Sequence, residues 1–549
     1  MERDEGAFDI IVIGTGLTES IAAAALSKAG FKVAQLDENQ YYGAEEASLS
    51  QDELLQWQDR QPAADDIYSS HTRSTRDVLP QSRQYSLSLL PSIIPSTGPL
   101  ISSLIQSGVS RYGGFRMIED VAMYHPSGTV KVVPGSKEDI FRDKSITLVD
   151  KRRLMRFLKF ASGDFEDSKE LEGKKEQGFF EFLQSTFSLN DDAASAIVYA
   201  LSYCQSASDP TIGALERLRR YLRSAGRYGH SPFLVGHYGS AGEIAQGFCR
   251  TSAVSGGVYI LGRKITSVKC TADQESEEQL PQYVIQMHEF PEPLTCKVLI
   301  SSASRIPDSL LSSSRLSELR KASGSSTFAR CMAIIDKPLS FRPPGQEDTP
   351  PEPEPDGEEA EADTPPQSPK SMDAGILIFP PSSLPGGKAT STVDVLIQGE
   401  GTMSTPQGKW IVYLTTINPA NESPEDLLRP YLEATLRLRK SEDDTTITPL
   451  FTSFYNQRAP LPSYATSTPL SPSTSPSFKL ADTSLPNYIL VPQLPQQPLP
   501  EPADVANVNA EKVFWDVIRI LRPEVLKQEG ESELTFWPPL PNDEGDEDD

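Results

Sequence analysis

The apolar positions near the start of the chain form two short runs separated by a stretch with helical spacing. Residues 8–13 (Phe-Asp-Ile-Ile-Val-Ile) are nearly all apolar, which is typical of a parallel strand buried on both faces. A Gly-Thr-Gly turn follows at 14–16, then an alanine-rich helical segment, and a second strand at 32–37. Gly30 suits the position just after a helix end. This βαβ order predicts a doubly wound sheet that starts at residue 8.

Helical spacing dominates the middle of the chain, from about Ser145 to Arg227. The pattern predicts four helices, around residues 148–158, 179–187, 192–203 and 213–222. Four consecutive helices without a strand between them indicate a small helical domain inserted into an α/β domain.

Later strands and polar stretches complete the predicted organisation. Strands are expected near 258–261, 283–287, 297–300, 331–335, 393–397, 410–414 and 488–491, with a short final helix at 511–521. Residues 50–85 are polar without a sustained period, so we expect a loop or insertion there. Residues 343–372 carry nine acids between Glu347 and Asp363 and almost no apolar side chains, which predicts an unfolded segment.

These patterns divide the chain into an interrupted α/β domain and several insertions. The predicted parts are an α/β domain over 1–144, a helical domain over 145–227, the α/β domain continued over 228–342, an acidic insertion at 343–372, final strands over 373–458, a proline- and serine-rich linker at 459–505, and a C-terminal helix with an acidic, proline-rich tail at 506–549.

Composition and charge argue against several classes of function. The chain has 549 residues, 51 Lys and Arg against 76 Asp and Glu, and a formal net charge of −25. An acidic balance argues against nucleic acid as a partner and against membrane binding through a polybasic patch. The five cysteines include no CxxC pair, so we expect reduced thiols rather than a zinc site or a disulfide framework. No histidine spacing is typical of a metal site, and no nucleophile elbow occurs, so no catalytic or metal residues are assigned.

The Gly-rich turn resembles a dinucleotide-binding loop with one important change. Such loops follow the pattern GxGxxG, in which the helix N-terminus faces a diphosphate. Here Gly14 and Gly16 are present, but Glu19 replaces the third glycine. A carboxylate there suits an empty helix N-terminus and opposes a bound diphosphate by charge and bulk. Asp37 stands where a ribose-binding acid belongs, so the scaffold of a flavin or nicotinamide domain is present with a damaged phosphate cradle.

Several blocks resemble the family of Rab GDP-dissociation inhibitors and Rab escort proteins. The matching blocks are residues 13–20, 37–43, 110–112, 151–158 and, longest, 226–259. The resemblance implies a flavoprotein-like α/β fold without a cofactor, together with the inserted helical domain. The insertions, residues 138–141 with 148–160, and Phe536-Trp537-Pro538-Pro539 look more like the escort branch of the family.

The resemblance also implies a platform that binds the GTPase. Carried over by position, Tyr42 lies in the first platform motif, and Glu243, Arg250 and Ile260 lie in the second. Exposed Tyr and Arg anchor interfaces well, and a Glu pairs with a basic side chain of the partner. The alternatives are a core tyrosine for Tyr42 and an intramolecular ion pair between Glu243 and Arg250.

In the same family the helical domain accommodates prenyl groups. Each methylene of such a chain contributes about 0.8 kcal/mol when buried. Phe179, Phe180 and Phe182 line the prenyl slot, pack as ordinary core, or contact the transferase. Phe179 lies near a position where escort proteins contact the transferase α subunit, and an ordinary core aromatic is the alternative.

Three functions follow from these observations. The first is a non-enzymatic Rab escort protein that binds GDP-bound Rab GTPases, presents them to the Rab geranylgeranyl transferase α/β heterodimer, and shields the geranylgeranyl lipid. Its expected location is the cytoplasm, with transient membrane contact. The second is a GDP-dissociation inhibitor that recycles prenylated Rab. The third is a flavin-dependent oxidoreductase on the same scaffold.

Overall fold

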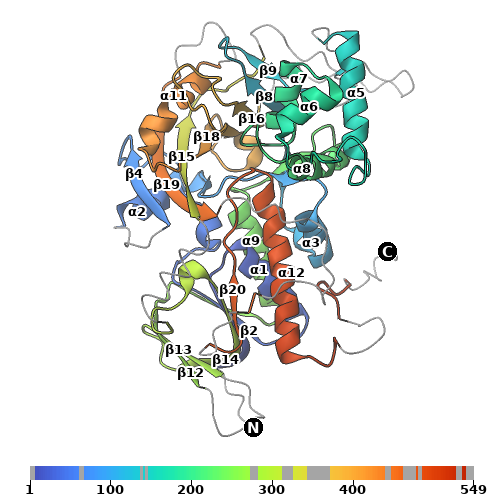
Figure 1. The fold of residues 1–549 in the computed structure, drawn as a ribbon. Helices are drawn as coiled ribbons and strands as arrows, with labels where there is room; N and C mark the ends of the chain where they lie inside the picture. Colours follow the sequence, from blue (N-terminus) through green and yellow to red (C-terminus); the bar gives the residue numbers. More distant parts are fainter. Residues whose placement is uncertain are drawn as a thin grey trace, which may run out of the picture.

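The computed structural model describes residues 6–60, 67–135, 140–141, 146–271, 282–311, 325–342, 371–438, 447–460, 478–479, 485–526 and 534–539. These residues build two large sheets and a helical domain that lies beside the second sheet (Figure 1). Within the described stretches, no helix combines the length and the apolar character needed to cross a bilayer.

The first sheet forms around the N-terminal strand, as the apolar run predicts. Its order is β11 (Val258–Leu261), β2 (Val33–Asp37), β1 (Ala7–Ile13), β14 (Leu294–Ser302), β13 (Gln282–Met287) and β12 (Ile265–Thr271), and β20 (Tyr488–Val491) also pairs with β14. The pairs from β11 through β14, and β14 with β20, are parallel, whereas β12, β13 and β14 pair in antiparallel fashion. Ile10, Ile11 and Val12 have no exposed surface, because helices or strands cover both faces of β1.

A layer of helices covers one face of this sheet. It consists of α1 (Leu17–Lys28), α3 (Pro99–Ser107), α9 (Ala241–Val254) and α12 (Glu501–Leu521). Every residue of α1 up to Ser27 is buried, and its alanines allow its neighbours to approach closely. Gly30 follows α1 with a φ of 85°, as predicted for a residue just after a helix end.

The second sheet is largely antiparallel and has a different cover on each face. Its order is β4 (Tyr68–Arg73), β19 (Phe451–Pro460), β15 (Ser325–Ile335), β18 (Trp410–Ile417), β17 (Val393–Gln398), β16 (Ala374–Phe379), β8 (Asp120–Tyr124) and β9 (Val130–Val132). Alternation along β15 sends Met332 and Ile334 to the side of the helical domain, and Cys331 and Ala333 to the side of α11 (Pro424–Leu436).

Short strands connect these layers. β6 (Ile94–Pro95), β10 (Phe233–Gly236) and β7 (Phe115–Met117) form a small sheet, and β3 (Ser48–Leu49) pairs with β5 (Leu87–Ser88). The short helix η3 (Val109–Arg111) follows α3. Segments that are far apart in the sequence therefore meet beside α9.

The helical domain contains the predicted helices with modest changes in their limits. They are α5 (Leu148–Ser162), α6 (Phe179–Phe187), α7 (Asp191–Ser195), which continues into a π-helical turn at Ala196–Leu201, and α8 (Thr211–Ser224). Phenylalanine rings from α5 and α6 form its centre, with Phe157 and Phe187 in edge contact at 5.2 Å.

A largely buried ionic cluster joins the helical domain to the helical layer of the first sheet. Arg220 of α8 donates to both carboxylate oxygens of Glu501 at 2.7 Å. Asp504, one turn along α12, accepts the amide hydrogen of Leu100 at 3.1 Å and thereby caps α3. Helices α3, α8 and α12 are therefore held at one point.

Residues 50–85, expected to form a loop or insertion, contain regular structure. Instead of an irregular loop they contain α2 (Gln51–Asp59) and β4, an edge strand of the second sheet. Ser50 and Glu53 form a capping box, in which each side chain binds the other residue's backbone. Polar composition hid these elements, because α2 buries only one side and β4 lies at an edge.

The C-terminal part is more ordered than predicted where the structure describes it. The last helix begins at Glu501 rather than at 511, and Leu494, Gln497 and Leu499 of the expected linker are buried. The predicted strand at 488–491 is confirmed as β20. Most of the acidic insertion (343–370) and residues 461–477 lie outside the described residues, and the limits assigned to each domain stay a prediction.

The C-terminal Phe-Trp pair packs on the helical layer. The Trp537 indole N–H donates to Ser103 Oγ at 2.7 Å, and its ring stacks on Phe248 of α9 at a centroid distance of 5.8 Å. Phe536 contacts Phe514 of α12 edge-on at 5.5 Å. This segment therefore covers the seam between α3, α9 and α12.

Candidate functional site

The dinucleotide-type loop lies where the sequence predicts, but a side chain of the protein occupies its anion position. β1 ends at Ile13, Gly14 turns with a φ of 105°, and α1 begins at Leu17. The first amide groups of a helix are free to bind an anion. Here the Leu17 N–H donates to Glu46 Oε2 at 3.0 Å, so a carboxylate of the chain takes the place of a phosphate.

Glu19 crowds the same space. A Cβ atom added to Gly16 would lie 2.6 Å from Glu19 Oε2 and 3.0 Å from Glu46 Oε2, so both carboxyl groups border the loop. Burial, together with the nearby Glu45, raises the pKa of Glu19 to about 7 and that of Glu46 well above its ordinary value. At least part of this pair is therefore protonated at neutral pH.

The predicted ribose-binding acid is also engaged within the chain. Asp37 accepts from the Thr15 amide at 2.9 Å and the Thr15 hydroxyl at 2.7 Å. Arg305 lies 3.2 Å from Asp37 and 3.4 Å from Glu45, and its side chain packs against Gly14. These acids have Arg305 as a shared counter-charge.

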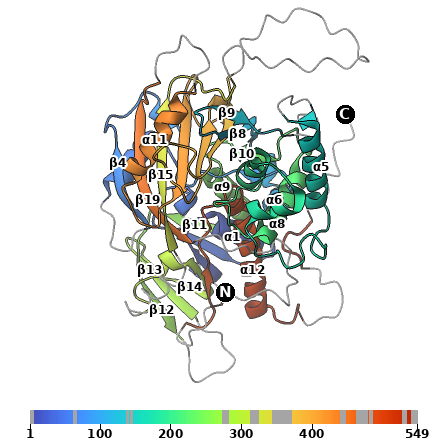
Figure 2. The same ribbon diagram turned by 45° about the horizontal axis from the view of Figure 1, so that its top comes forward.

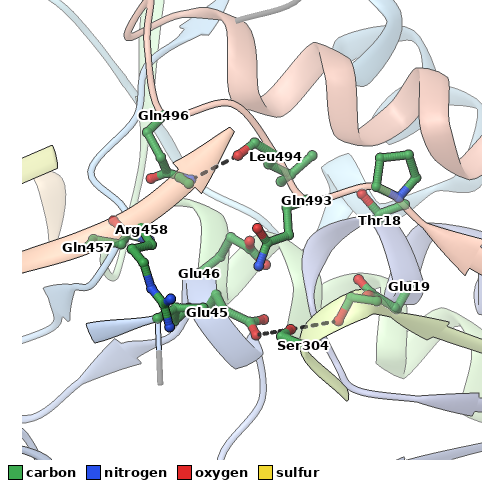
Figure 3. Close-up of a pocket in the computed structure, with 14 residues that line it drawn as sticks. Thr18, Glu19, Glu45, Glu46, Ser304, Gln457, Arg458, Gln493, Leu494 and Gln496 are labelled. Atoms are coloured by element: carbon green, nitrogen blue, oxygen red, sulfur yellow. Dashed lines mark hydrogen bonds between the residues drawn. The ribbon is translucent and has the colours of Figure 1, made fainter. Parts of the chain in front are cut away.

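The residues at this loop therefore do not fit a dinucleotide. Glu46 occupies the phosphate position, and Asp37, the acid expected to bind a ribose, is already engaged by Thr15 and Arg305. The pocket beside them offers about 30 Å³ to water-sized molecules, room for about two waters. Figure 3 shows Glu19, Glu45 and Glu46 bordering this pocket, with Arg458 of β19 and Gln493 on its other sides.

The predicted platform residue Tyr42 lies in the loop between β2 and the Glu46 turn. Its ring is half-buried and contacts Tyr259 edge-on, with centroids 6.0 Å apart. Gly43 fixes this loop against the start of α9. It has a φ of 98°, and an added Cβ would lie 3.1 Å from Gly242 Cα. Any side chain at this glycine would push Tyr42 away from α9.

Glu243 and Arg250 both lie on α9, but they do not pair with each other. The Arg250 guanidinium is exposed and lies over the ring of Tyr112, 4.4 Å from its centroid. Glu243 is half-buried, burial raises its pKa, and it has no ion pair with any described residue. The alternative of an intramolecular Glu243–Arg250 pair is therefore wrong.

Ile260 stands apart from the other three. It lies on β11, the edge strand next to β2, and packs against the core on the face of the sheet that α9 does not cover. Its neighbour Tyr259 points toward Tyr42 and α9, because successive residues of a strand point to opposite faces. The structure thus gathers Tyr42, Glu243 and Arg250 beside α9 and places Ile260 around the sheet edge.

Phe179 is fully buried at the start of α6. Its ring contacts Phe157 at 6.3 Å and Phe182 at 6.4 Å, so its side chain forms part of the core of the helical domain. In this conformation it presents no side-chain surface to a partner. Its predicted contact with the transferase stays a prediction.

Comparison with known proteins places this geometry in a family. The model of the family described as GDP dissociation inhibitor matches residues 1–341. The chain belongs to that family. Among curated relatives, it is 37% identical over 297 residues to the "Rab proteins geranylgeranyltransferase component A" of Drosophila melanogaster, and 28% identical over 426 residues to the protein of the same name in Saccharomyces cerevisiae. The matches cover 50% and 76% of this chain, and 56% and 63% of those relatives.

The chain's matches thus span little more than half the length of these family members. Among solved structures, a Rab GDI from Plasmodium falciparum superposes with a TM-score of 0.60 at 18% identity, covering 93% of this chain and 98% of that one. An oxidoreductase from Methanosarcina mazei superposes with a TM-score of 0.53 at 14% identity, covering 92% and 99%. At these identities the structures confirm the predicted flavoprotein-like fold alone.

Sequence reasoning missed three residues of the candidate site. Tyr112 lies in a block used for the resemblance, yet only the fold reveals that it supports Arg250. Glu46 and Arg305 close the loop from positions 29 and 288 residues after Leu17, and nothing in the sequence around Arg305 indicates this role. A search for acids shortly after the Tyr-Tyr-Gly motif would have found Glu46.

Proposed function

We propose that this chain is a Rab escort protein, the non-catalytic component A of a Rab geranylgeranyl transferase. The main support is the combination of the relatives' shared name with a dinucleotide loop closed by Glu46. It binds unprenylated, GDP-bound Rab, presents it to the transferase α/β heterodimer, and delivers the prenylated product to membranes. It works in the cytoplasm with transient membrane contact.

The GTPase docks on the face formed by Tyr42, Tyr112, Glu243 and Arg250. Glu243 is a half-buried carboxylate without an ion-pair partner among the described residues, so a basic side chain of the GTPase satisfies it. Arg250 is held by the Tyr112 ring, and Tyr112 is itself 58% exposed. Such a preordered Arg–Tyr pair loses little side-chain entropy on binding. Ile260 adds apolar contact around the edge of the sheet.

The chain contributes by recruitment rather than by bond chemistry. The transferase supplies the reaction, and the GTPase keeps its own nucleotide. By holding the GTPase and contacting the enzyme, the chain raises the effective concentration of the substrate cysteines at the enzyme. The enzyme contact involves the helical domain, where Phe179 contributes by shaping the packing of α6.

The helical domain also takes up the geranylgeranyl chain. Phe157, Phe179, Phe182 and Phe187 pack against one another in the present conformation. Helices that slide past each other open a slot between such rings. Burial of each lipid methylene, about 0.8 kcal/mol, offsets the cost of parting them.

The deciding experiment measures transfer of a labelled geranylgeranyl group to purified Rab by the transferase, with and without this chain. We expect transfer to depend on the chain. Arg250→Ala should reduce this stimulation, whereas Arg437→Ala, an exposed arginine at the end of α11, serves as the matched control. If the chain does not stimulate transfer, the escort function is wrong.

A GDP-dissociation inhibitor is the second candidate, because the same family and the same platform serve both functions. It predicts no stimulation of transfer and efficient extraction of prenylated Rab from membranes. The flavin-dependent oxidoreductase has no support from the loop, since Glu46 takes the phosphate position and Asp37 is already engaged by Thr15 and Arg305. A purified protein with bound flavin would reverse that assessment.

A further inference from the structure

The exposed face of α5 carries an unusual concentration of positive charge for so acidic a chain. α5 runs from Leu148 to Ser162 on the outer side of the helical domain, at the periphery of the molecule in Figures 1 and 2. Leu154, Phe157 and Leu158 point inward and are buried. The residues on the outward arc are Leu148, Val149, Arg152, Arg153, Arg156 and Lys159, which are all exposed. At 3.6 residues per turn they share one side of the helix.

Among the described residues, the one carboxylate that pairs with this arc is Asp150, and it meets Arg153 alone. The Asp150 carboxylate accepts from the Thr147 hydroxyl at 2.7 Å and lies 3.5 Å from the Arg153 guanidinium. Within the described part of the chain, Arg152, Arg156 and Lys159 form no ion pair. Arg156 lies over the Phe187 ring at 5.4 Å, which orients its guanidinium without neutralising it.

Large apolar side chains protrude at the N-terminal end of the same face. Leu148 is 77% exposed, Val149 is 55% exposed and Phe141 is 61% exposed. The Lys151 ammonium donates to the Phe141 carbonyl at 2.8 Å, which holds Phe141 beside the first turn of α5. The surface therefore combines an apolar tip with a basic flank.

We propose that this surface, the α5 face, docks on anionic phospholipid headgroups at a membrane surface. Basic side chains attract such headgroups, while protruding apolar side chains enter the boundary between headgroups and acyl chains. The net charge of −25 repels the rest of the molecule from the same surface. The local charge thus selects one orientation, with α5 toward the lipid.

The acidic total charge argued against membrane binding through a polybasic patch, and the α5 face revises that expectation. Charges interact over a Debye length of about 10 Å, so four basic residues on one arc attract an anionic surface whatever the net charge of the chain. The biological use of the contact rests on the proposed escort function, since delivery of a prenylated GTPase requires an approach to the bilayer. The contact itself needs neither the GTPase nor the transferase. Its failure is therefore distinguishable from failure of the escort function.

The test is flotation of the full chain alone with phosphatidylcholine vesicles, with and without phosphatidylserine. We expect binding only to the vesicles that contain phosphatidylserine, and less binding as salt is raised. Arg152→Glu combined with Arg156→Glu should weaken the vesicle partition constant at least about 25-fold, since each neutralised side chain is expected to change it about fivefold. Leu148→Ala combined with Val149→Ala should weaken it without changing the salt dependence.

The control is Lys264→Glu combined with Lys269→Glu, which makes the same charge change near and on β12, at the far end of the molecule from α5 (Figure 1). Equal binding by the α5 and control variants would overturn the proposal, as would wild-type protein that does not bind acidic vesicles. If the α5 variant keeps its vesicle binding and loses geranylgeranyl transfer, the face is a docking site for the transferase instead. Intact transfer without vesicle binding overturns the membrane contact and leaves the escort function standing.

Discussion

The buried carboxyl pair at the closed loop makes stability depend on pH in an unusual direction. The pKa of Glu19 rises from its ordinary value of 4.5 to about 7, mainly because the group is buried. The folded protein therefore binds this proton more tightly than the unfolded chain does. Its contribution to stability is complete below pH 4.5 and is lost as the pH rises through about 7.

The size of the pKa shift of Glu19 sets how much the free energy of unfolding changes with pH. Each pKa unit corresponds to about 1.4 kcal/mol, so ionising Glu19 in the folded state costs about 3 kcal/mol. Glu19→Gln keeps the shape of the side chain and removes the charge. We expect the variant to gain about 2 kcal/mol or more over the wild type when the pH is raised from about 5 to about 8.

The assay is urea unfolding of both proteins at the two pH values, followed by circular dichroism. Glu181→Gln, which changes an exposed carboxylate on α6, is the matched control and should track the wild type. Because a charge on Glu19 raises the pKa of Glu46, the measured difference also includes the response of Glu46. A gain of equal size at both pH values would refute the reasoning, since it would mean that Glu19 is ionised throughout.

Three further predictions concern other parts of the molecule. Arg250→Ala should weaken GTPase binding about tenfold or more in a titration, with an unchanged melting temperature, because its side chain is exposed; a lower melting temperature would indicate a structural role instead. Trp537→Ala should lower the free energy of unfolding by about 3 kcal/mol in urea titration, because it leaves a cavity between α3, α9 and α12 and removes the hydrogen bond to Ser103. An unchanged free energy of unfolding would mean that Trp537 does not pack there. Glu501→Gln should cost about 2 kcal/mol by the same measurement, because Arg220 loses its nearer carboxylate and keeps only Asp504 at 3.6 Å. A loss no larger than that of an exposed ion pair would contradict this reasoning.

The fold could be predicted from local patterns where these coincide with burial. The apolar run at 8–13, the turn at Gly14 and the helical stop at Gly30 all act through neighbours in sequence, so the βαβ unit followed directly. The helices of the inserted domain were also predicted, because the spacing of their apolar residues matches the face that each helix buries. By contrast, α2 was missed although its capping box, Ser50 with Glu53, was readable.

The candidate site was predicted only in part, because its decisive contacts are tertiary. Glu19 indicated a damaged phosphate cradle, but the group that closes it, Glu46, reaches the helix from a separate turn. The stacking of Arg250 on Tyr112 depends on how η3 meets α9, which no local pattern specifies. Total charge likewise concealed the α5 face, although the helical spacing of its basic residues was present in the sequence.

The contact between Glu46 and the start of α1 makes folding of this loop independent of a bound cofactor. In a nucleotide-binding relative of this fold, an incoming molecule must supply the anion at that helix end, so the empty and loaded forms differ in stability by mass action. Here the chain supplies its own acceptor, the Glu46 carboxyl group, 3.0 Å from the Leu17 amide. The loop therefore reaches its final shape during folding, at any cellular supply of flavin. Added dinucleotide should leave the melting temperature where it is.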